Sequence, residues 1–192
     1  VQLAKPEPEV AAALHAMKKK LLGERNRRHA PFIDRQQFVN WNGMLITAFL
    51  EAGIVLGEPR YHEFAVKSFE RIVRSSYRDG AGFSHQVGAA PGSQSALLDD
   101  QVQMLNAALL AYQITGAQRY LQIAEATFQF IWKHFWDDSG GGFFDRQADP
   151  KALAILGARL KHLVDTSTSA ANPLAANVFL DLEDSDGLSS TA

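Results

Sequence analysis

The chain of 192 residues contains no cysteine. This absence excludes disulfide bonds, thiolate metal ligands and cysteine nucleophiles, and it is typical of proteins from a reducing compartment. An excess of basic charge is also lacking, because 19 Lys and Arg residues stand against 21 Asp and Glu. With a formal net charge of -2, no overall positive field draws the chain to nucleic acid or to an anionic membrane. We therefore expect no nucleic-acid partner, no membrane partner and a cytoplasmic location.

Several sequence motifs that would announce a function are missing as well. No apolar run approaches the roughly 20 residues that span a bilayer, and no signal peptide is visible. There is no GxxxxGK[ST] loop for phosphate, no HExxH motif and no spaced histidine cluster. The glycine-rich run Ser139–Asp145 does not lie between a buried strand and a helix, as a phosphate loop would. We therefore expect neither a metal nor a cofactor.

The feature that the sequence does contain is an internal repeat. A nearly all-apolar helical segment stops at a glycine, an Arg-Tyr pair follows, and an amphipathic helical segment comes next. The same order returns roughly 60 residues later, and a third unit begins at Ala170. Glycine suits each stop because it adopts a positive φ at little cost at the end of a helix. The matching positions are Gly57 with Gly116, Arg60 with Arg119 and Tyr61 with Tyr120.

The two helices of each repeat differ in polarity. A helix that is apolar all round is buried on every side, whereas an amphipathic helix faces water on one side. Alternation of inner and outer helices is typical of an α/α toroid, and the period exceeds the roughly 34 residues of a tetratricopeptide solenoid, the less favoured alternative. We therefore predict an all-α fold, a partial α/α toroid over residues 31–182 with short β-like loops on one face. It would hold about two and a half hairpins, preceded by a helix within 1–30 and followed by a disordered acidic tail over 183–192.

The connections predict where a functional site lies. Turns from inner to outer helix are short, whereas connections from outer to inner helix are long, and long loops on one face of a rigid scaffold usually carry the site. The side chains there suit a sugar, because aromatic faces stack on sugar rings and carboxylates or histidine bind hydroxyls or transfer protons. The candidate catalytic residues are His85, Asp99, Asp100 and Asp145. The candidate substrate-binding residues are Trp41, Asn42, Phe83, Phe144, Thr168 and Asn172.

Each of these candidates also has a structural interpretation. Asp99 or Asp100 is placed to be an N-cap that accepts backbone N–H bonds. Trp41 precedes an apolar helix and is equally suited to anchor the core. His85 follows one glycine-aromatic turn, "DGAGFSH", and Asp145 follows the other, "SGGGFFD". The glycines predict tight turns, and the aromatics predict the rim of the pocket.

At this point the sequence resembles a known family. The run "PFIDRQQFVNWNGMLI" at residues 31–46 resembles a segment of the spermatogenesis-associated, thioredoxin-domain-containing proteins and their bacterial relatives. "GEPRY", "LLDDQV", "FWDDSGGGFFD" and "DTSTSAANPLAA" follow in the family's order, so the resemblance covers residues 10–182. It implies a six-hairpin toroid similar to N-acylglucosamine 2-epimerases and several glycosidases, normally preceded by a thioredoxin-like domain. The implied activity is that of a sugar epimerase, isomerase or glycosidase acting on a small carbohydrate.

Two departures from the family pattern fall on the expected pocket face. The family's D-D-K stands here as Asp34-Arg35-Gln36, and its T-P-S-G-N-S keeps Thr168 and Asn172 but lacks the glycine. A second hypothesis is therefore a non-catalytic interaction or structural module. The inner helices of an incomplete toroid expose apolar surface, which another domain or protein would cover. The cover would be a thioredoxin-like domain, a partner protein or a second copy of the chain.

Overall fold

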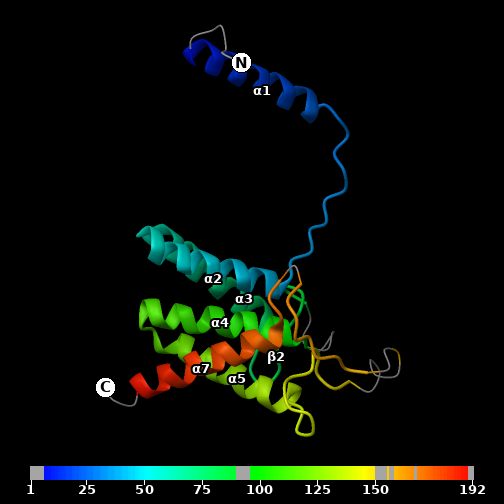
Figure 1. Cartoon of the computed structure of the whole chain (residues 1–192), viewed down its shortest axis with the longest axis vertical. Coiled ribbons are helices and arrows are strands. Elements are labelled where there is room, and N and C mark those ends of the chain that lie inside the picture. Colours follow the sequence, from blue (N-terminus) through cyan, green and yellow to red (C-terminus); the bar gives the residue numbers. More distant parts are fainter. Residues whose placement is uncertain (1–6, 90–95, 150–154, 156–157, 167, 190–192) are drawn as a thin grey trace. The chain divides into compact units, whose positions relative to one another are not determined.

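The computed structural model describes residues 7–89, 96–149, 155, 158–166 and 168–189, and Figure 1 shows its ribbon. The chain forms two separate units, Val1–Arg35 and Gln36–Ala192. The first contains helix α1, which begins at Glu7 and ends at Asn26 with two glutamates in its first turn. No residue of α1 is buried within its unit. The second unit therefore holds the whole core, and it begins five residues later than the boundary predicted at Pro31.

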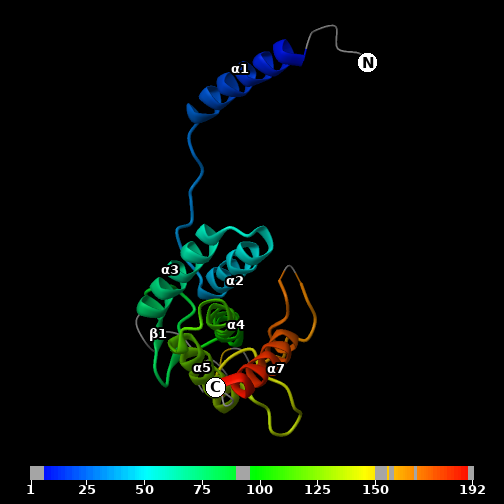
Figure 2. The same ribbon diagram turned by 90° about the vertical axis from the view of Figure 1, so that its left-hand side faces the viewer.

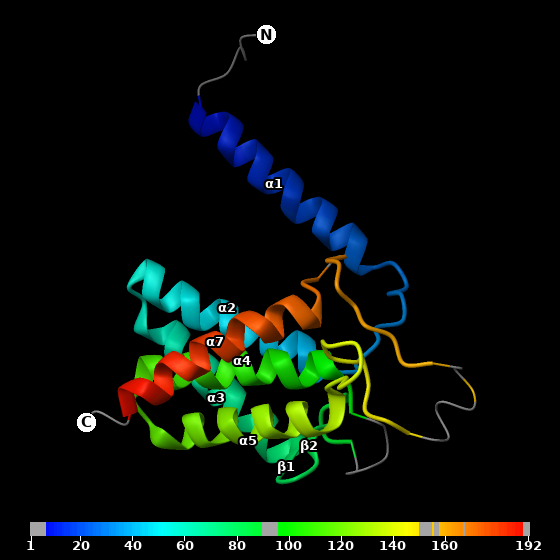
Figure 3. The ribbon, with the colours of Figure 1, turned by 60° about the horizontal axis from the view of Figure 1, so that its bottom comes forward.

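The second unit consists of alternating inner and outer helices, as predicted. The inner helices lie alongside one another and run in the same direction, while the outer helices return along them (Figures 1 and 3). Two very short strands follow the first outer helix and form an antiparallel hairpin. The inner helices are α2 (Val39–Leu56), α4 (Leu98–Thr115) and α7 (Ala171–Ser189), the outer helices are α3 (Pro59–Ser76) and α5 (Gln118–Phe135), and the strands are β1 (Tyr77–Arg78) and β2 (Gly82–Phe83).

The ends of the inner helices follow from the repeated glycines. Gly57 ends α2 at φ 64° and Gly116 ends α4 at φ 66°, both in the left-handed conformation that closes a helix. The N–H of Gly116 donates to the carbonyl of Tyr112 over 2.7 Å, which satisfies one of the last carbonyls of α4. The matched glycines that were predicted to stop the helices therefore do so in both copies.

Helix α4 is the centre of the core. It contacts α2 and α7 on either side and α5 on the outside, and Figure 2 shows it end-on among them. Its side chains are consequently buried around most of its circumference, from Val102 to Ala111. Helix α2 is also long and apolar enough, by length and composition alone, to cross a membrane. Its apolar face packs on α3 and α4 in this core, which accounts for that composition.

The last helix corrects one prediction. Helix α7 continues to Ser189, so residues 183–189 of the expected disordered tail are helical, and residues 190–192 lie outside the described part of the chain. Leu182 packs into the core, and the buried Ser185 hydroxyl donates to the carbonyl of Asp181 over 2.8 Å. The exposed Glu183 and Asp184 thus stand between the buried Leu182 and Ser185, and the burial of one helix face outweighs their charge.

Candidate functional site

Each long connection is tied to the start of an inner helix by main-chain hydrogen bonds. The N–H of Val39, the first residue of α2, donates to the carbonyl of His85 over 2.9 Å. The N–H of Leu98, the first residue of α4, donates to the carbonyl of Asp145 over the same distance, 2.9 Å. His85 and Asp145 therefore hold equivalent positions in the repeat, at the N-terminal ends of the inner helices where the site was predicted.

The two turns are held in place by a second repeated contact. In the first, Gln101 of α4 accepts a bond from the N–H of Phe83 and donates to its carbonyl, both over 2.8 Å. In the second, Asn172 of α7 accepts from the N–H of Phe143 over 2.7 Å and donates to its carbonyl over 2.8 Å. A side-chain amide can make this pair of bonds because it carries both a donor and an acceptor. We call each pair an amide clasp.

His85 is held by the carboxylate of Asp100, which is fully buried. Its Nδ1 lies 2.9 Å from Oδ2 and 3.1 Å from Oδ1 of Asp100, and the ring of Phe38 lies over it with centroids 4.8 Å apart. Asp100 also accepts a 2.9 Å bond from the backbone N–H of Asn40 in α2. Within the described part of the chain, the second ring nitrogen of His85, Nε2, has no hydrogen-bond partner. An imidazole oriented through one nitrogen and unpartnered at the other suits proton transfer.

The electrostatics of this pair follow from its geometry. The hydrogen bond that His85 donates to Asp100 raises the pKa of His85 above its usual value of 6.5, although burial acts in the opposite direction. Burial in turn raises the pKa of Asp100, while the bonds from His85 and Asn40 oppose this. The buried carboxylate therefore favours a protonated imidazole beside it.

The neighbouring Asp99 has different partners. Its Oδ2 accepts a 2.7 Å bond from the side-chain amide of Asn40, and its Oδ1 accepts a 3.3 Å bond from Gln103. The N-cap residue of α4 is Leu97, and no side chain caps the helix there. The interpretation of Asp99 or Asp100 as a cap of their own helix is therefore wrong. Asp100 instead accepts a backbone N–H from the first turn of the adjacent helix α2.

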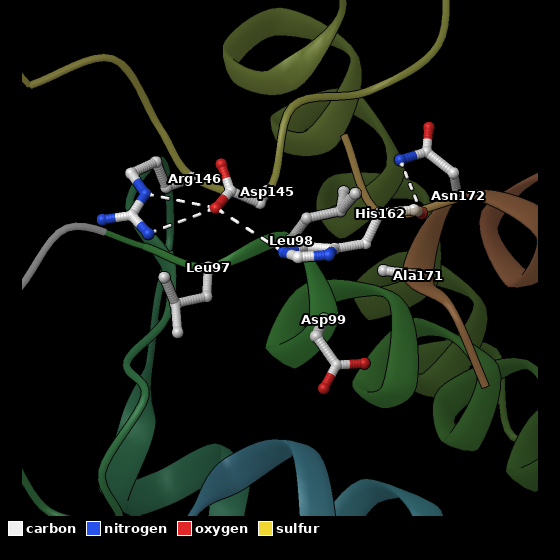
Figure 4. A pocket seen from close by; sticks show the side chains of 8 residues that line it. All are labelled: Leu97, Leu98, Asp99, Asp145, Arg146, His162, Ala171 and Asn172. Atoms are coloured by element: carbon white, nitrogen blue, oxygen red, sulfur yellow. Dashed lines mark hydrogen bonds and ion pairs between the residues drawn. The ribbon is translucent and has the colours of Figure 1, made fainter. Parts of the chain in front are cut away.

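A cavity of about 230 Å³ lies beside these residues, between α4 and the start of α7. Asp145 and His162 point toward one another in Figure 4, with 4.0 Å between Oδ2 and Nε2. The same Oδ2 accepts bonds of 3.3 and 3.2 Å from Arg146, and Oδ1 accepts a 3.0 Å bond from the N–H of Leu160. The cavity is lined by Leu97, Leu98, Asp99, Asp145, Arg146, His162, Ala171 and Asn172.

Comparison with known proteins identifies the family of the chain. The sequence profile of the N-acylglucosamine 2-epimerase family, also called GlcNAc 2-epimerase, matches residues 41–158, well over half of the chain. The chain belongs to this family. Spermatogenesis-associated protein 20 from Homo sapiens is 26% identical over 182 residues, and the protein of that name from Rattus norvegicus is 28% identical over 186 residues. In both, the match covers 90% of this chain but only 23% of the relative, so the chain spans about a quarter of the length of these relatives.

Solved structures with the same fold include sugar epimerases and isomerases. Cellobiose 2-epimerase from Bacillus thermoamylovorans superposes with a TM-score of 0.60 and 12% identity, over 78% of this chain and 39% of that protein. A D-mannose isomerase gives a TM-score of 0.57 and 16% identity, over 79% of this chain and 40% of that protein. At these identities the comparison establishes the α/α toroid alone, and it confirms the predicted fold class.

The aromatic residues predicted to bind substrate divide into three cases. Trp41 is 60% exposed and meets Phe38 edge-on with ring centroids 5.2 Å apart, so the interpretation of Trp41 as a core anchor is wrong. Phe83 is only 1% exposed, and its assignment to the substrate wall is wrong too. The amide clasp draws the backbone of Phe83 onto α4 and turns the ring into the core. Phe144 is partly covered by the guanidinium of Arg159, 3.8 Å from its ring centroid.

The polar residues predicted to bind substrate also differ in placement. Asn172 lines the cavity, but it is buried and fully engaged in its amide clasp and in a 3.3 Å bond to the carbonyl of His162. Asn42 donates to the carbonyl of Phe38 over 2.7 Å, which closes the first turn of α2. Thr168 accepts a 3.1 Å backbone bond from Thr166 and is not among the cavity-lining residues.

Two polar residues of the cavity, Arg146 and His162, were missed from the sequence. Arg146 directly follows Asp145, and this adjacency of opposite charges was a signal that could have placed it at the site. His162 stands in a long connection without helical or strand periodicity. No pattern in the sequence indicates that its ring turns toward Asp145.

Proposed function

We propose that the second unit is a sugar-binding module of the epimerase and isomerase type, with His85 as its proton-transfer group. The observation that carries this proposal is the pairing of His85 with the buried Asp100, which leaves Nε2 without a partner among the described residues. Asp99, the neighbour of Asp100 in α4, lines the cavity between α4 and the start of α7.

The cavity has the size and the chemistry for one sugar unit. Its volume of about 230 Å³ is below the roughly 300–1,000 Å³ of sites for drug-sized ligands. The carboxylates of Asp99 and Asp145 accept bonds from sugar hydroxyls, while Arg146 and His162 donate to them. The exposed ring of Trp41, on the first turn of α2, offers an apolar face of the kind that stacks on a sugar.

The chemistry that such a pair performs is proton transfer next to a carbonyl. In an open-chain sugar, Nε2 of neutral His85 would remove the proton from the carbon beside the carbonyl, and the electron pair would form an enediolate. Asp100 would stabilise the imidazolium that results, because the hydrogen bond between them is strongest when the histidine is charged. The proton on Nε2 exchanges with water, and delivery of a proton to the other face of the carbon or to the neighbouring carbon then gives the epimer or the isomer. By raising the pKa of His85, the carboxylate makes Nε2 of the neutral ring a stronger base.

The comparisons support the substrate class. The chain belongs to the N-acylglucosamine 2-epimerase family, and proteins of the same fold are named cellobiose 2-epimerase and D-mannose isomerase. A reducing sugar or an N-acylated hexosamine is therefore the first class to test. Because the chain spans only part of its relatives, the proposal concerns this module and not the whole of those proteins.

The test is proton exchange in heavy water. The full chain is incubated with mannose, cellobiose and N-acetylglucosamine, and loss of the proton signal at carbon 2 is followed by NMR. We expect slow exchange that falls at least roughly 100-fold in His85→Asn. The matched control is His15→Asn, because His15 is an exposed histidine of the separate first unit. Exchange that is unchanged in His85→Asn, or no exchange with any of the sugars, would overturn the proposal.

A further inference from the structure

The start of α2 packs closely against the start of α4. A Cβ added at Gly43 would lie 2.9 Å from the Cβ of Gln103 and 3.0 Å from its carbonyl carbon, so a larger residue there would push the two helices apart. This approach brings Asn40, in the first turn of α2, within hydrogen-bond distance of the neighbouring acids Asp99 and Asp100. The N–H groups of a first helical turn have no partner inside their own helix, so that of Asn40 is available to another element.

Asn40 bonds to both acids at once. Its backbone N–H donates to Oδ1 of Asp100 over 2.9 Å, and its side-chain Nδ2 donates to Oδ2 of Asp99 over 2.7 Å. Its side-chain oxygen accepts a 2.8 Å bond from the N–H of Trp41, so the orientation of the amide is fixed. Asn40 and Asp99 are each the second residue of their inner helix, and the link therefore joins equivalent positions of two adjacent repeats.

The two acids serve different sites. Asp100 is fully buried and holds Nδ1 of His85, whereas Asp99 lines the cavity between α4 and the start of α7. Successive residues of a helix point about 100° apart, which allows this division. Besides Asn40, Asp99 has one hydrogen-bond partner in the described part of the chain, Gln103 over 3.3 Å. The bond from Asn40 is therefore the stronger of the two that fix the Asp99 carboxylate.

We propose that Asn40 is a positioning residue, whose side chain holds the carboxylate of Asp99 at the cavity wall while its backbone holds Asp100. A side-chain amide suits this task, because it donates to a carboxylate without changing the charge of the site. Without it, the side chain of Asp99 would keep only the long bond from Gln103 and would move among rotamers. In the proposed reaction Asp99 accepts a bond from a sugar hydroxyl, so the side chain of Asn40 acts on substrate binding. This consequence rests on the proposed function, whereas the position of Asp99 itself does not.

NMR measures the position of Asp99 without any substrate. Three-bond couplings to its two Cβ protons report the χ1 angle, and we expect the values of a single rotamer in the unaltered protein. In Asn40→Ala the couplings should shift toward the average of several rotamers, because the amide donor is gone. Gln37→Ala removes an exposed amide just before α2 and is the matched control, which should leave the couplings of Asp99 unchanged.

A kinetic cycle tests whether Asn40 acts through Asp99. Proton exchange at carbon 2 is measured on the full chain with the fastest-exchanging of mannose, cellobiose and N-acetylglucosamine. We expect Asn40→Ala to raise KM roughly tenfold and to lower kcat by less than about threefold, because it disturbs a binding group and leaves the proton-transfer group in place. In a chain that already carries Asp99→Ala, the same change should alter KM by less than about twofold. Gln37→Ala should leave both constants unchanged.

A reciprocal swap tests the bond between the two side chains. Asn40→Asp places a carboxylate where Asp99 has its amide donor, and repulsion between the two charges should lower the melting temperature by several degrees. Adding Asp99→Asn exchanges donor and acceptor, so most of the loss should be recovered. KM should stay raised in this double variant, because the carboxylate no longer stands at the cavity wall. Gln37→Glu adds the same charge at an exposed position and should leave the melting temperature unchanged.

Three results would overturn the proposal. The first is a single Asp99 rotamer that Asn40→Ala leaves unchanged. The second is an effect of Asn40→Ala on KM that is as large with Asp99→Ala as without it. The third is a swap that recovers none of the lost stability. Absence of exchange with all three sugars would overturn the proposed function alone, and the couplings of Asp99 would still decide the role of Asn40.

Discussion

The two glycine-aromatic turns share a backbone and differ in chemistry. Both bond through a carbonyl to the first residue of the preceding inner helix, and both are held by an amide clasp. In the first turn the residue after this framework is His85, which meets the buried Asp100. In the second it is Asp145, which meets Arg146 and His162 beside an open cavity.

This difference separates the structural part of the repeat from its functional part. In both copies the glycine, the clasped phenylalanine and the main-chain hydrogen bonds hold the turn against the inner helices. The position two residues beyond the phenylalanine carries a basic ring in one copy and an acid in the other. The repeat therefore places a polar side chain at the same end of each hairpin. The type of residue at that position determines its partners and its chemistry.

The largest expected difference between the turns is in stability, when the glycine just before each clasped phenylalanine is replaced by alanine. Gly82 and Gly142 both have a positive φ, so alanine costs each about 1–2 kcal/mol of conformational strain. A Cβ at Gly82 would lie 2.5 Å from Oε1 of Gln101 and 2.6 Å from the Phe130 ring, whereas at Gly142 the nearest atom is 3.3 Å away. Overpacking adds about 1–3 kcal/mol at the first turn. We expect Gly82→Ala to lower the free energy of unfolding by about 4 kcal/mol and Gly142→Ala by about 2 kcal/mol.

Urea unfolding followed by circular dichroism measures both values. Gly80→Ala is the control, because it has a positive φ and nothing within 4 Å of an added Cβ, and it should resemble Gly142→Ala. Equal losses at Gly82 and Gly142 would show that the close approach of the first turn to α4 is not tightly packed.

The next largest difference is expected between Asp100 and Asp145, in the stability lost when each is replaced by asparagine. Asp100→Asn leaves His85 and the N–H of Asn40 without their buried carboxylate, and we expect a loss of about 3 kcal/mol. Asp145→Asn breaks a partly exposed pair with Arg146, and we expect a loss of about 1 kcal/mol. The same unfolding measurement applies to both. The double variant His85→Asn with Asp100→Asn should recover part of the first loss, and additive losses would contradict a direct coupling between the two residues.

The smallest effect is a pH dependence that belongs to the first turn. The hydrogen bond that His85 donates to Asp100 raises the pKa of His85 in the folded protein above its unfolded value. The pair therefore stabilises the fold fully below about pH 6.5, and that stabilisation is lost as the pH rises through the raised folded pKa. We expect the melting temperature to fall between pH 6 and 9 more steeply in the unaltered protein than in His85→Asn. Parallel curves for the two proteins would be inconsistent with this pairing.

Much of the fold was predictable because it rests on local patterns. The apolar and amphipathic helices follow from a period of 3.6 residues, and the stops at Gly57 and Gly116 follow from the conformational freedom of glycine. The end of α7 was not predictable in this way. Its acidic residues favour an exposed tail, and only the packing of Leu182 shows that one face is buried.

The site was predictable in its location and not in its contacts. The loop lengths alone placed it at the N-terminal ends of the inner helices, where His85, Asp99, Asp100 and Asp145 lie. The sequence could not predict that Trp41 is exposed and Phe83 buried, because exposure depends on how each segment packs against its neighbour.

The sequence by itself determined the repeat: the order of inner and outer helices, their glycine ends and the two glycine-aromatic turns. These features depend on residues within a few positions of one another, so local physics is enough to specify them. Only the tertiary structure decided that His85 meets Asp100, that Asp145 meets His162 and that apolar residues of α5 and α7 line a common groove. Each of these contacts joins separate elements, and the way those elements pack sets the direction in which a side chain points.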